Sequence, residues 1–391
     1  MRLRRVAMSG TVEQYGNGWR YRAAIGMNPD TGARRWVSKG GFPTKKAAKA
    51  ALTAVLADAD KGVVVDRTPL KVGEYLDQWL DGVAGDLKPT TLEGYRQAVK
   101  RLKRTIGDVK LQDLRPLTVE RAYQKLTRSG LAAKTVLNTH TVLRRALGDA
   151  ERLDMVVRNA AASARPPSVR RKEQATWTPE QLSSFLESTA DHRLFAAFVL
   201  GATTGMRRGE LMGLRWSDVD LDAGRLSVVA TITTVNGRAI ESSTKTNKSR
   251  RRIALDSGTV GVLRAHQERQ DEERQLAGAL WHESGLVFTR EDGTALHPDR
   301  FSHLFARLMR KANLPPIRLH DLRHTYATLA LEAGVHPKIV SERLGHATTG
   351  ITLDLYSHVA PSMDEQAAET VAGLFTLPGQ SHPSDGEAAS A

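Results

Sequence analysis

Alternation between apolar and polar side chains marks the start of the chain as β-structure. Two alternating stretches flank Gly16-Asn17-Gly18, which predicts a hairpin. A second turn over 28–32 leads to a third strand, and Thr44 then caps an alanine-rich helix. The predicted strands are 11–15, 19–25 and 34–39, and the predicted helix is 45–59. We therefore expect residues 1–66 to form a small three-stranded β-sheet backed by one helix.

Apolar residues over 70–158 instead follow the three-and-four spacing of amphipathic helices. One such face consists of Val72, Tyr75, Leu76, Trp79 and Leu80. Lys88-Pro89 begins a second helix, and two more begin near Thr118 and Ala133. We expect a bundle of four or five helices with its basic residues outward, namely Arg96, Lys100, Lys103 and Arg104.

The third region is separated from the bundle by a linker over 159–175, in which prolines prevent helix formation. Thr178 and Pro179 begin a helix, and 176–377 has the pattern of a mainly α domain with a small β-sheet. Residues 378–391 are small and polar, and we expect disorder there. The predicted fold class is therefore multidomain α+β.

Composition favours a polyanionic partner. The 391 residues carry a formal net charge of +14, with a pI near 10.0. Such charge favours nucleic acid, although ribosomal and membrane-surface proteins share it. The absence of cysteine excludes disulfides, thiolate metal sites and a cysteine nucleophile. We find neither an apolar run long enough to span a membrane nor a secretory signal, so we expect no membrane partner and a cytoplasmic location.

Basic residues of the N-terminal sheet, the bundle and the linker are candidates for DNA contact. The exposed face of the N-terminal sheet should carry three arginines beside aromatic residues, although a merely solvated domain would look similar. Charges on the bundle are ordinarily a wet helix face, whereas the basic run in the linker suits an extended strap along a phosphate backbone. The DNA-binding candidates are Arg20, Arg22, Arg35, Lys39, Arg96, Lys100, Arg170 and Arg171.

Six residues able to act on one phosphodiester follow in order through the C-terminal half. They are Arg207, Lys245, His320, Arg323, His346 and Tyr356. Two guanidiniums, an ammonium, two imidazoles and a phenol suit a negatively charged reaction centre. Neither an acidic pair nor a cysteine cluster accompanies them, so we expect no metal and no other cofactor.

Arg207 lies in T-G-M-R-R-G-E, between an apolar helix over 194–203 and a second helix over 208–214. Gly205 permits a tight turn, so Arg207 should project from a junction between helices. Its planar guanidinium can bind two phosphate oxygens at once. Glu210 could orient Arg207 or cap the local helix.

The lysine candidates lie between two predicted strands. The β-branched stretch 226–235 predicts a strand that ends in an Asn236-Gly237 turn, and 251–255 predicts another. Lys245, in the polar link, could give a proton to a departing 5′ oxygen. Lys248 is the competing candidate, and taken alone either one would be an ordinary surface lysine.

The remaining candidates lie in L-H-D-L-R-H and L-G-H…L-Y-S-H. His320 and Arg323 share a helix face, so they can point toward the same place. His320 and His324 also have the spacing of a zinc-binding pair, but no glutamate follows His320 and Arg323 would repel a cation. A tyrosine in the apolar setting of Tyr356 is ordinarily a core residue, and it is the ordered set of six that favours chemistry.

Residues 177–359 resemble the catalytic domain of the tyrosine recombinase, or phage-type integrase, family. T-G-M-R-R-G-E, H-D-L-R-H-T and L-G-H…L-Y-S-H-V match its motifs nearly letter for letter. Residues 70–158 resemble, more loosely, its helical core-binding domain, and 1–66 resemble the arm-binding domain of many mobile-element integrases. All six motif positions match, but the lysine motif varies in this family, which leaves Lys248 open.

The resemblance implies a site-specific DNA recombinase that cuts and rejoins strands through a 3′-phosphotyrosyl intermediate and integrates DNA, with excision left open. Tyr356 would attack the scissile phosphate while Lys245 protonates the leaving 5′ oxygen. His320 would act as a base or stabilise the intermediate. The groups holding the non-bridging oxygens would be Arg207, Arg323 and His346. Neither ATP nor a metal would be consumed.

The resemblance also implies partners. A predicted helix over 361–375 has an apolar stripe that would dock on a neighbouring subunit, giving a homotetramer on two double-stranded DNA sites, or else pack on its own domain. The sequence does not determine the attachment sites, the type of mobile element, the preferred direction, or a need for an excisionase or host DNA-bending protein. Two other functions stay open: a type IB topoisomerase, against which the N-terminal sheet argues, and a regulator that never cuts, against which the six residues argue.

Overall fold

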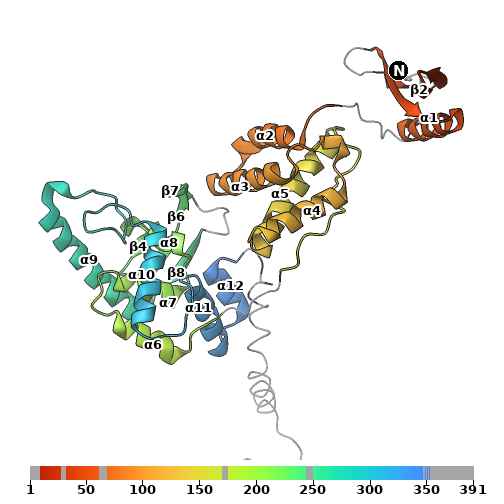
Figure 1. Ribbon diagram of the computed structural model, residues 1–391. Coiled ribbons are helices and arrows are strands. Elements are labelled where there is room, and N and C mark those ends of the chain that lie inside the picture. Colours follow the sequence, from red (N-terminus) through yellow and green to blue (C-terminus); the bar gives the residue numbers. More distant parts are fainter. Residues whose placement is uncertain are drawn as a thin grey trace, which may run out of the picture. The chain divides into compact units, whose positions relative to one another are not determined.

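The computed structural model describes residues 9–27, 32–60, 68–169, 175–243, 250–346, 348, 350 and 352. The chain divides into two compact units, Met1–Arg171 and Lys172–Ala391 (Figure 1). Several predictions fall outside the described residues, namely those for Arg170, Arg171, Lys245, Lys248, Tyr356, the helix over 361–375 and the tail. Among the described helices, none is both long and apolar enough to cross a bilayer.

The N-terminal elements form the predicted sheet and helix. Strands β1 (Ser9–Tyr15), β2 (Gly18–Met27) and β3 (Arg34–Phe42) pair antiparallel in the order β1-β2-β3, and α1 (Lys45–Asp60) covers one face. The Thr44 hydroxyl accepts a hydrogen bond from the Ala47 amide at 3.1 Å, which confirms the predicted cap. Tyr21, Ala23 and Ile25 alternate along β2 and pack with Leu52 of α1.

The opposite face of this sheet carries Arg20 and Arg22, as predicted. Arg22 pairs with Ser38 across the strands, and its guanidinium lies 5.7 Å from the ring of Trp36. The prediction that Arg35 shares this face is wrong. Arg35 alternates with Trp36 and so lies on the side of Val37, which packs toward α1. A register shift between Ala24 and Met27 separates Arg35 from the regular pairing.

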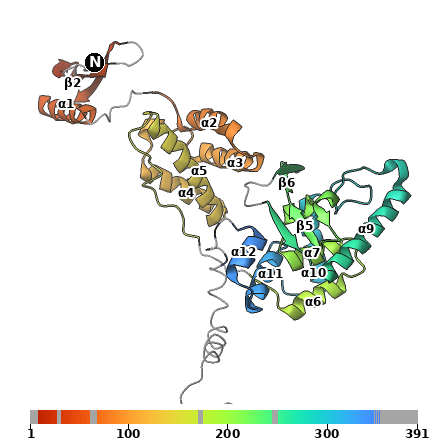
Figure 2. The ribbon, with the colours of Figure 1, turned by 180° about the vertical axis from the view of Figure 1, so that it is seen from behind.

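Four α-helices make up the bundle, within the predicted range. They are α2 (Val72–Val83), α3 (Pro89–Ile106), α4 (Pro116–Arg128) and α5 (Ala133–Arg152), with 3-10 turns at Ala84–Asp86 and Leu111–Asp113 (Figure 2). The predicted apolar face of α2 is buried, and the Trp79 indole donates to Asp149 at 2.8 Å. The four basic residues predicted to lie outward are exposed. Ala160, Ala161 and Ala164 belong to the same core, so the first part of the predicted linker packs against the bundle.

The second unit is mainly helical with two small sheets. Its helices are α6 (Pro179–Ser188), α7 (Phe195–Thr204), α8 (Arg208–Met212), α9 (Ser257–Ala277), α10 (Pro298–Lys311), α11 (Asp321–Glu332) and α12 (Pro337–Leu344), with 3-10 turns at Trp216–Asp218 and Gly278–Leu280. Its strands are β4 (Val219–Asp220), β5 (Arg225–Val228), β6 (Ala230–Val235), β7 (Arg238–Ser243) and β8 (Arg251–Ala254). Thr178 caps α6 as predicted, accepting from the Gln181 amide at 3.3 Å.

The single strand predicted over 226–235 is wrong, because the chain breaks at Val229. Residues before the break form β5, which pairs with β4 and β8, and residues after it form the β6–β7 hairpin. The Asn236-Gly237 turn is confirmed, and both residues have the positive φ that such a turn requires. The break lets one run of β-branched residues serve two sheets.

Aromatic side chains fill the core beneath these sheets. Phe185 lies edge-on to Phe198 and Phe305, with ring centroids 5.3 and 5.1 Å away. Trp177 packs on Phe185 and Phe305, and its indole donates to the Pro315 carbonyl at 2.9 Å. This core holds α6, α7 and α10 together and so fixes the ends of α7 and α11, where the candidate residues lie.

Candidate active site

Arg207 is presented by a tight turn between α7 and α8. Gly205 ends α7 with φ of 62°, a left-handed conformation that favours glycine. A Cβ at this position would lie 2.5 Å from Leu344 Cδ2 and 2.9 Å from Tyr326 Cδ1, so a side chain has no room. Arg207 is the N-cap residue of α8 and therefore projects from the junction, as predicted.

Arg323 lies at the buried end of the same cluster, in the first turn of α11. Its side chain is among the buried residues, and its Nη1 donates to the Gly205 carbonyl at 2.8 Å. Its Nη2 donates to the Leu344 carbonyl at 2.7 Å. Burial and the charge of Arg207 lower the pKa of Arg323 to about 9, so the guanidinium is still charged at neutral pH.

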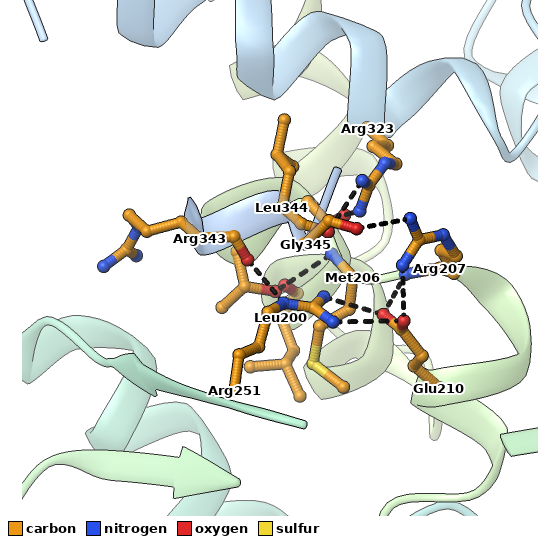
Figure 3. Close-up of polar contacts among 11 residues, drawn as sticks. Leu200, Met206, Arg207, Glu210, Arg251, Arg323, Arg343, Leu344 and Gly345 are labelled. Carbon is orange, nitrogen blue, oxygen red and sulfur yellow. Dashed lines mark hydrogen bonds and ion pairs between the residues drawn. The ribbon is translucent and has the colours of Figure 1, made fainter. Parts of the chain in front are cut away.

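The end of α12 brings these arginines together. Three consecutive carbonyls at the helix end accept from three different arginines: Arg343 O from Arg251 Nε at 2.6 Å, Leu344 O from Arg323 Nη2 at 2.7 Å, and Gly345 O from Arg207 Nη2 at 2.9 Å (Figure 3). The last carbonyls of a helix have no partner within the helix and carry partial negative charge. Guanidiniums satisfy both needs, so the turn that leads to His346 is held from three sides.

Glu210 is the one carboxylate in this cluster that Figure 3 shows. It accepts from the Arg207 amide at 2.9 Å and from Arg207 Nη1 at 2.8 Å, so it both caps α8 and orients Arg207. Arg251 adds two further bonds, at 3.1 and 2.8 Å. Burial would raise the pKa of Glu210, but the hydrogen bonds and charges of Arg251 and Arg207 outweigh it, and the net shift is downward. Glu210 is therefore ionised at neutral pH.

His346 follows this turn directly. Its Nδ1 shares a hydrogen bond of 2.8 Å with the hydroxyl of Thr352. Burial and the charges of Arg323 and Arg207 lower the pKa of His346 to about 4, so the ring is neutral at pH 7. If the Thr352 hydroxyl donates to Nδ1, the proton of the neutral ring sits on Nε2 and can be donated to an anion.

His320 and His324 lie before and after Arg323 in the sequence, at the start of α11. His320 is the N-cap residue of α11, and its ring lies edge-on to that of His324 with centroids 5.3 Å apart. Surrounding protein atoms and the charge of Arg323 lower the pKa of His320 even though its side chain reaches solvent. Burial and His320 lower the pKa of His324 to about 4. Across the described residues, no group of three or more acidic or histidine side chains is arranged to hold a metal ion.

The structure thus places three of the six predicted residues on one turn. Arg207 and Arg323 bind it, and His346 extends it, while His320 lies beside Arg323. Lys245 and Tyr356 lie outside the described residues. Sequence reasoning missed Arg251 as part of this cluster. The available signal was its place at the start of the strand that follows the lysine-bearing link.

Comparison with known proteins assigns each of the three regions of the chain to a domain family. Residues 176–363 match the Phage integrase family, residues 71–127 match the Phage integrase N-terminal SAM-like domain, and residues 12–59 match the Arm DNA-binding domain. A relative named Tyrosine recombinase XerC-like, from Caldanaerobacter subterraneus subsp. tengcongensis, is 31% identical over 85% of this chain and 90% of its own length. An integrase from Streptomyces ambofaciens is 28% identical over 91% of this chain and 93% of its own length.

Solved structures share the fold. The Tn1549 transposon integrase in complex with a circular intermediate DNA has a TM-score of 0.66 and 21% identity, and the match covers 76% of this chain and 99% of that one. A lambda integrase tetramer bound to a Holliday junction has a TM-score of 0.56 and 19% identity over 87% of this chain and 92% of that one. The motifs, the arginine cluster and these matches agree. The chain therefore belongs to the phage integrase family of tyrosine recombinases, the enzymes of mobile elements that cut and rejoin DNA strands.

Proposed function

We propose that this recombinase cleaves DNA with Tyr356 and integrates or excises a mobile element by exchanging the cut strands. The Tyr356 oxygen forms a bond to the scissile phosphorus, and the bond from phosphorus to the 5′ oxygen breaks. The products are a 3′-phosphotyrosyl link and a free 5′ hydroxyl. Attack by the 5′ hydroxyl of a partner strand then reverses the step and releases the tyrosine, so no external energy source is needed.

The observation that carries this proposal is the convergence of Arg207 and Arg323 on the turn before His346. Each guanidinium donates two hydrogen bonds to protein atoms and has further N–H groups; the Arg207 side chain is 38% exposed, whereas Arg323 is 3% exposed and adds its charge from beneath. We assign to these arginines and to His346 the stabilisation of the charge that gathers on the non-bridging oxygens. Removing one such donor typically costs on the order of 10²–10³ in rate.

Proton transfer is assigned to His320 and Lys245. The lowered pKa of His320 favours the neutral ring, which can accept the phenolic proton of Tyr356. Lys245 protonates the leaving 5′ oxygen, and Lys248 is the alternative. Comparing Lys245→Ala with Lys248→Ala on a substrate whose 5′ leaving group is a thiol distinguishes them, because a thiolate leaves without a proton. Only the variant that lacks the true acid is rescued.

DNA binding is assigned to the sheet, the bundle and the linker. Arg20 and Arg22 share the sheet face that carries the exposed rings of Tyr15 and Trp36. Arg20 is partly neutralised by Glu13 at 2.5 Å, which leaves Arg22 as the stronger phosphate or base contact on that face. The remaining proposed contacts are Lys39, Arg96, Lys100, Arg170 and Arg171, whereas Arg35, on the α1 side of the sheet, is no longer proposed.

Assembly is the second part of the proposal. We infer a homotetramer on two DNA sites, in which the helix over 361–375 docks on a neighbouring catalytic unit. Lambda integrase forms a tetramer on a Holliday junction, and the fold that this chain shares with it supports the analogy. An excisionase or a host DNA-bending protein would determine whether the reaction runs toward integration or excision. We propose a cytoplasmic location, where the DNA is.

The test is covalent trapping on DNA that flanks the gene. A pool of lightly nicked duplexes tiling that DNA is incubated with the full-length protein in EDTA, and adducts are recovered with detergent. The wild type should give a protease-sensitive adduct, and Tyr356→Phe should give none while it still shifts the DNA. Tyr326→Phe removes another hydroxyl of the same unit, one that accepts from Arg343 at 2.7 Å, and should retain the adduct. An adduct that survives in Tyr356→Phe would reject the assignment.

A second test addresses the N-terminal sheet. Deletion of residues 1–66 should abolish integration but spare cleavage at the trapped core site, because the sheet binds a DNA site separate from the one that is cut. Equal loss of both activities would leave this domain with only a structural role.

A further inference from the structure

Arg251 is the most deeply embedded member of the arginine cluster after Arg323. It begins β8, and its side chain is only 7% exposed. Its Nε donates to the Arg343 carbonyl at 2.6 Å, and its Nη atoms donate to the two oxygens of Glu210 at 3.1 and 2.8 Å. These contacts connect β8 to α8 and to the end of α12.

Both contacts of Arg251 lead to Arg207. Glu210, which Arg251 binds with two bonds, holds the amide and Nη1 of Arg207. Arg343 O, which Arg251 also binds, belongs to the turn whose Gly345 carbonyl receives Arg207 Nη2. Figure 3 shows Glu210 and Gly345 beside the Arg207 guanidinium. Arg251 binds Glu210 directly, and it binds the Arg343 carbonyl two residues before Gly345.

We propose that Arg251 is a positioning residue for DNA cleavage, which fixes the Arg207 guanidinium and the turn that carries His346 without itself touching the phosphate. This inference rests on the proposed function, because it assumes that Arg207 binds the scissile phosphate. The planar fork of arginine is needed here, because one ammonium cannot pair with both oxygens of Glu210 and also reach the Arg343 carbonyl.

The experiment compares Arg251→Lys with Arg193→Lys in the full-length protein. Arg193 is a matched control, because it also makes a partly buried, two-bond ion pair, with Glu273, and donates to the Thr289 carbonyl at 2.6 Å. It lies in the same unit, but its contacts involve α9 and not the arginine cluster. Single-turnover cleavage and DNA binding are measured for each variant, using the defined nicked duplex recovered by trapping, and rates are divided by the folded fraction.

Two substrates separate positioning from stability. The first has the normal scissile phosphodiester, and the second has a methylphosphonate there, which lacks the negative charge that Arg207 neutralises. On the phosphodiester, Arg251→Lys should bind DNA within about twofold of wild type but cleave about 10²-fold more slowly, the usual effect of a misplacement of about 1 Å. On the methylphosphonate, this penalty should shrink to less than about tenfold, because that substrate depends less on Arg207. Arg193→Lys should match wild type on both substrates.

A double variant guards against misfolding. Arg251→Met combined with Glu210→Gln removes both members of the buried Arg251–Glu210 ion pair, so neither is left buried without the other, and the double variant should fold even where Arg251→Met alone does not. If Arg251 acts through Glu210, the double variant should cleave within about threefold of Glu210→Gln alone, because residues in one contact chain do not add.

Three outcomes would contradict these statements in different ways. If the wild type cleaves but Arg251→Lys loses the same factor on both substrates, or behaves like Arg193→Lys, this inference is overturned and the proposed function stands. A double variant much slower than Glu210→Gln would overturn the route through Glu210. If the wild type gives no adduct at all, the proposed function itself fails and the inference falls with it.

Discussion

Replacing Gly205 by alanine tests whether the turn before Arg207 is as confined as the structure indicates. Gly205 has φ of 62°, and its missing side chain would lie 2.5 Å from Leu344 Cδ2. A non-glycine residue in this conformation costs about 1–2 kcal/mol. Overpacking typically adds about 1–3 kcal/mol, and neither neighbour can move freely. Leu344 is fully buried, and the ring of Tyr326 is tied through its hydroxyl to Arg343. We therefore expect Gly205→Ala to lower the free energy of unfolding by about 2–5 kcal/mol.

Gly334→Ala isolates the steric part of this effect. Gly334 has φ of 78° just after α11, in the same unit, but nothing lies within 4 Å of its would-be Cβ. Gly334→Ala should therefore lower the free energy of unfolding only by the conformational penalty of about 1–2 kcal/mol. The assay is hydrogen exchange under increasing urea, read on peptides from α11 and α12 so that only this unit is reported. Equal losses for the two variants would refute the argument that Leu344 and Tyr326 close the turn.

Three further predictions follow from single contacts. Thr352→Val should slow cleavage about tenfold, without weakening DNA binding, by removing the hydroxyl that orients His346, and Thr352→Ser should restore the rate. The unfolded chain binds more protons than the native one between pH 6.5 and about 4, because the pKa of His346 falls from 6.5 to about 4 on folding. The free energy of unfolding should therefore decrease as the pH is lowered from 6.5 to about 4, by at most about 1.4 kcal/mol per pH unit for this histidine. His346→Asn should make the free energy of unfolding, measured with urea, depend less on pH in that range. Arg22→Gln should reduce the slope of log affinity against log salt for arm DNA by about 1, whereas Arg35→Gln, on the α1 side of the sheet, should change it less.

The sequence predicts what local rules decide. The cap at Thr178, the left-handed end of α7 at Gly205 and the Asn236-Gly237 turn each follow from residues a few positions apart, and the structure has all three. The motifs likewise identified Arg207, Arg323 and His346. The break at Val229 was not predictable this way, because β-branched residues continue across it and only the pairing with β8 and β7 divides them.

Arg251 escaped prediction for a related reason. Its partners Glu210 and Arg343 lie 41 and 92 positions away along the chain, and no periodicity links such distant residues. Arg35 was misplaced because the face of a strand residue depends on how the strand pairs: Ala23 pairs with Val37 on the α1 side, and Arg35, two positions before Val37, lies on that side too. In both cases the missing information is long-range contact.

Burial is the first cause of the lowered pKa values in the site, and positive charge within the cluster is the second; under the proposed function, this charge is what matches the site to its substrate. Arg207, Arg251 and Arg323 surround Glu210, so the cluster keeps a surplus of positive charge in a partly dry environment. Burial first, and this surplus second, lower the pKa of Arg323 and of His346. In the free protein the carbonyls at the end of α12 offset part of it with their partial negative charge. A phosphodiester, which gains charge as it is attacked, would offset the rest, and the attraction would be greatest when that charge is greatest. Under the proposed function, an arginine cluster held by backbone carbonyls and one carboxylate would therefore favour the transition state over the bound substrate, as catalysis requires.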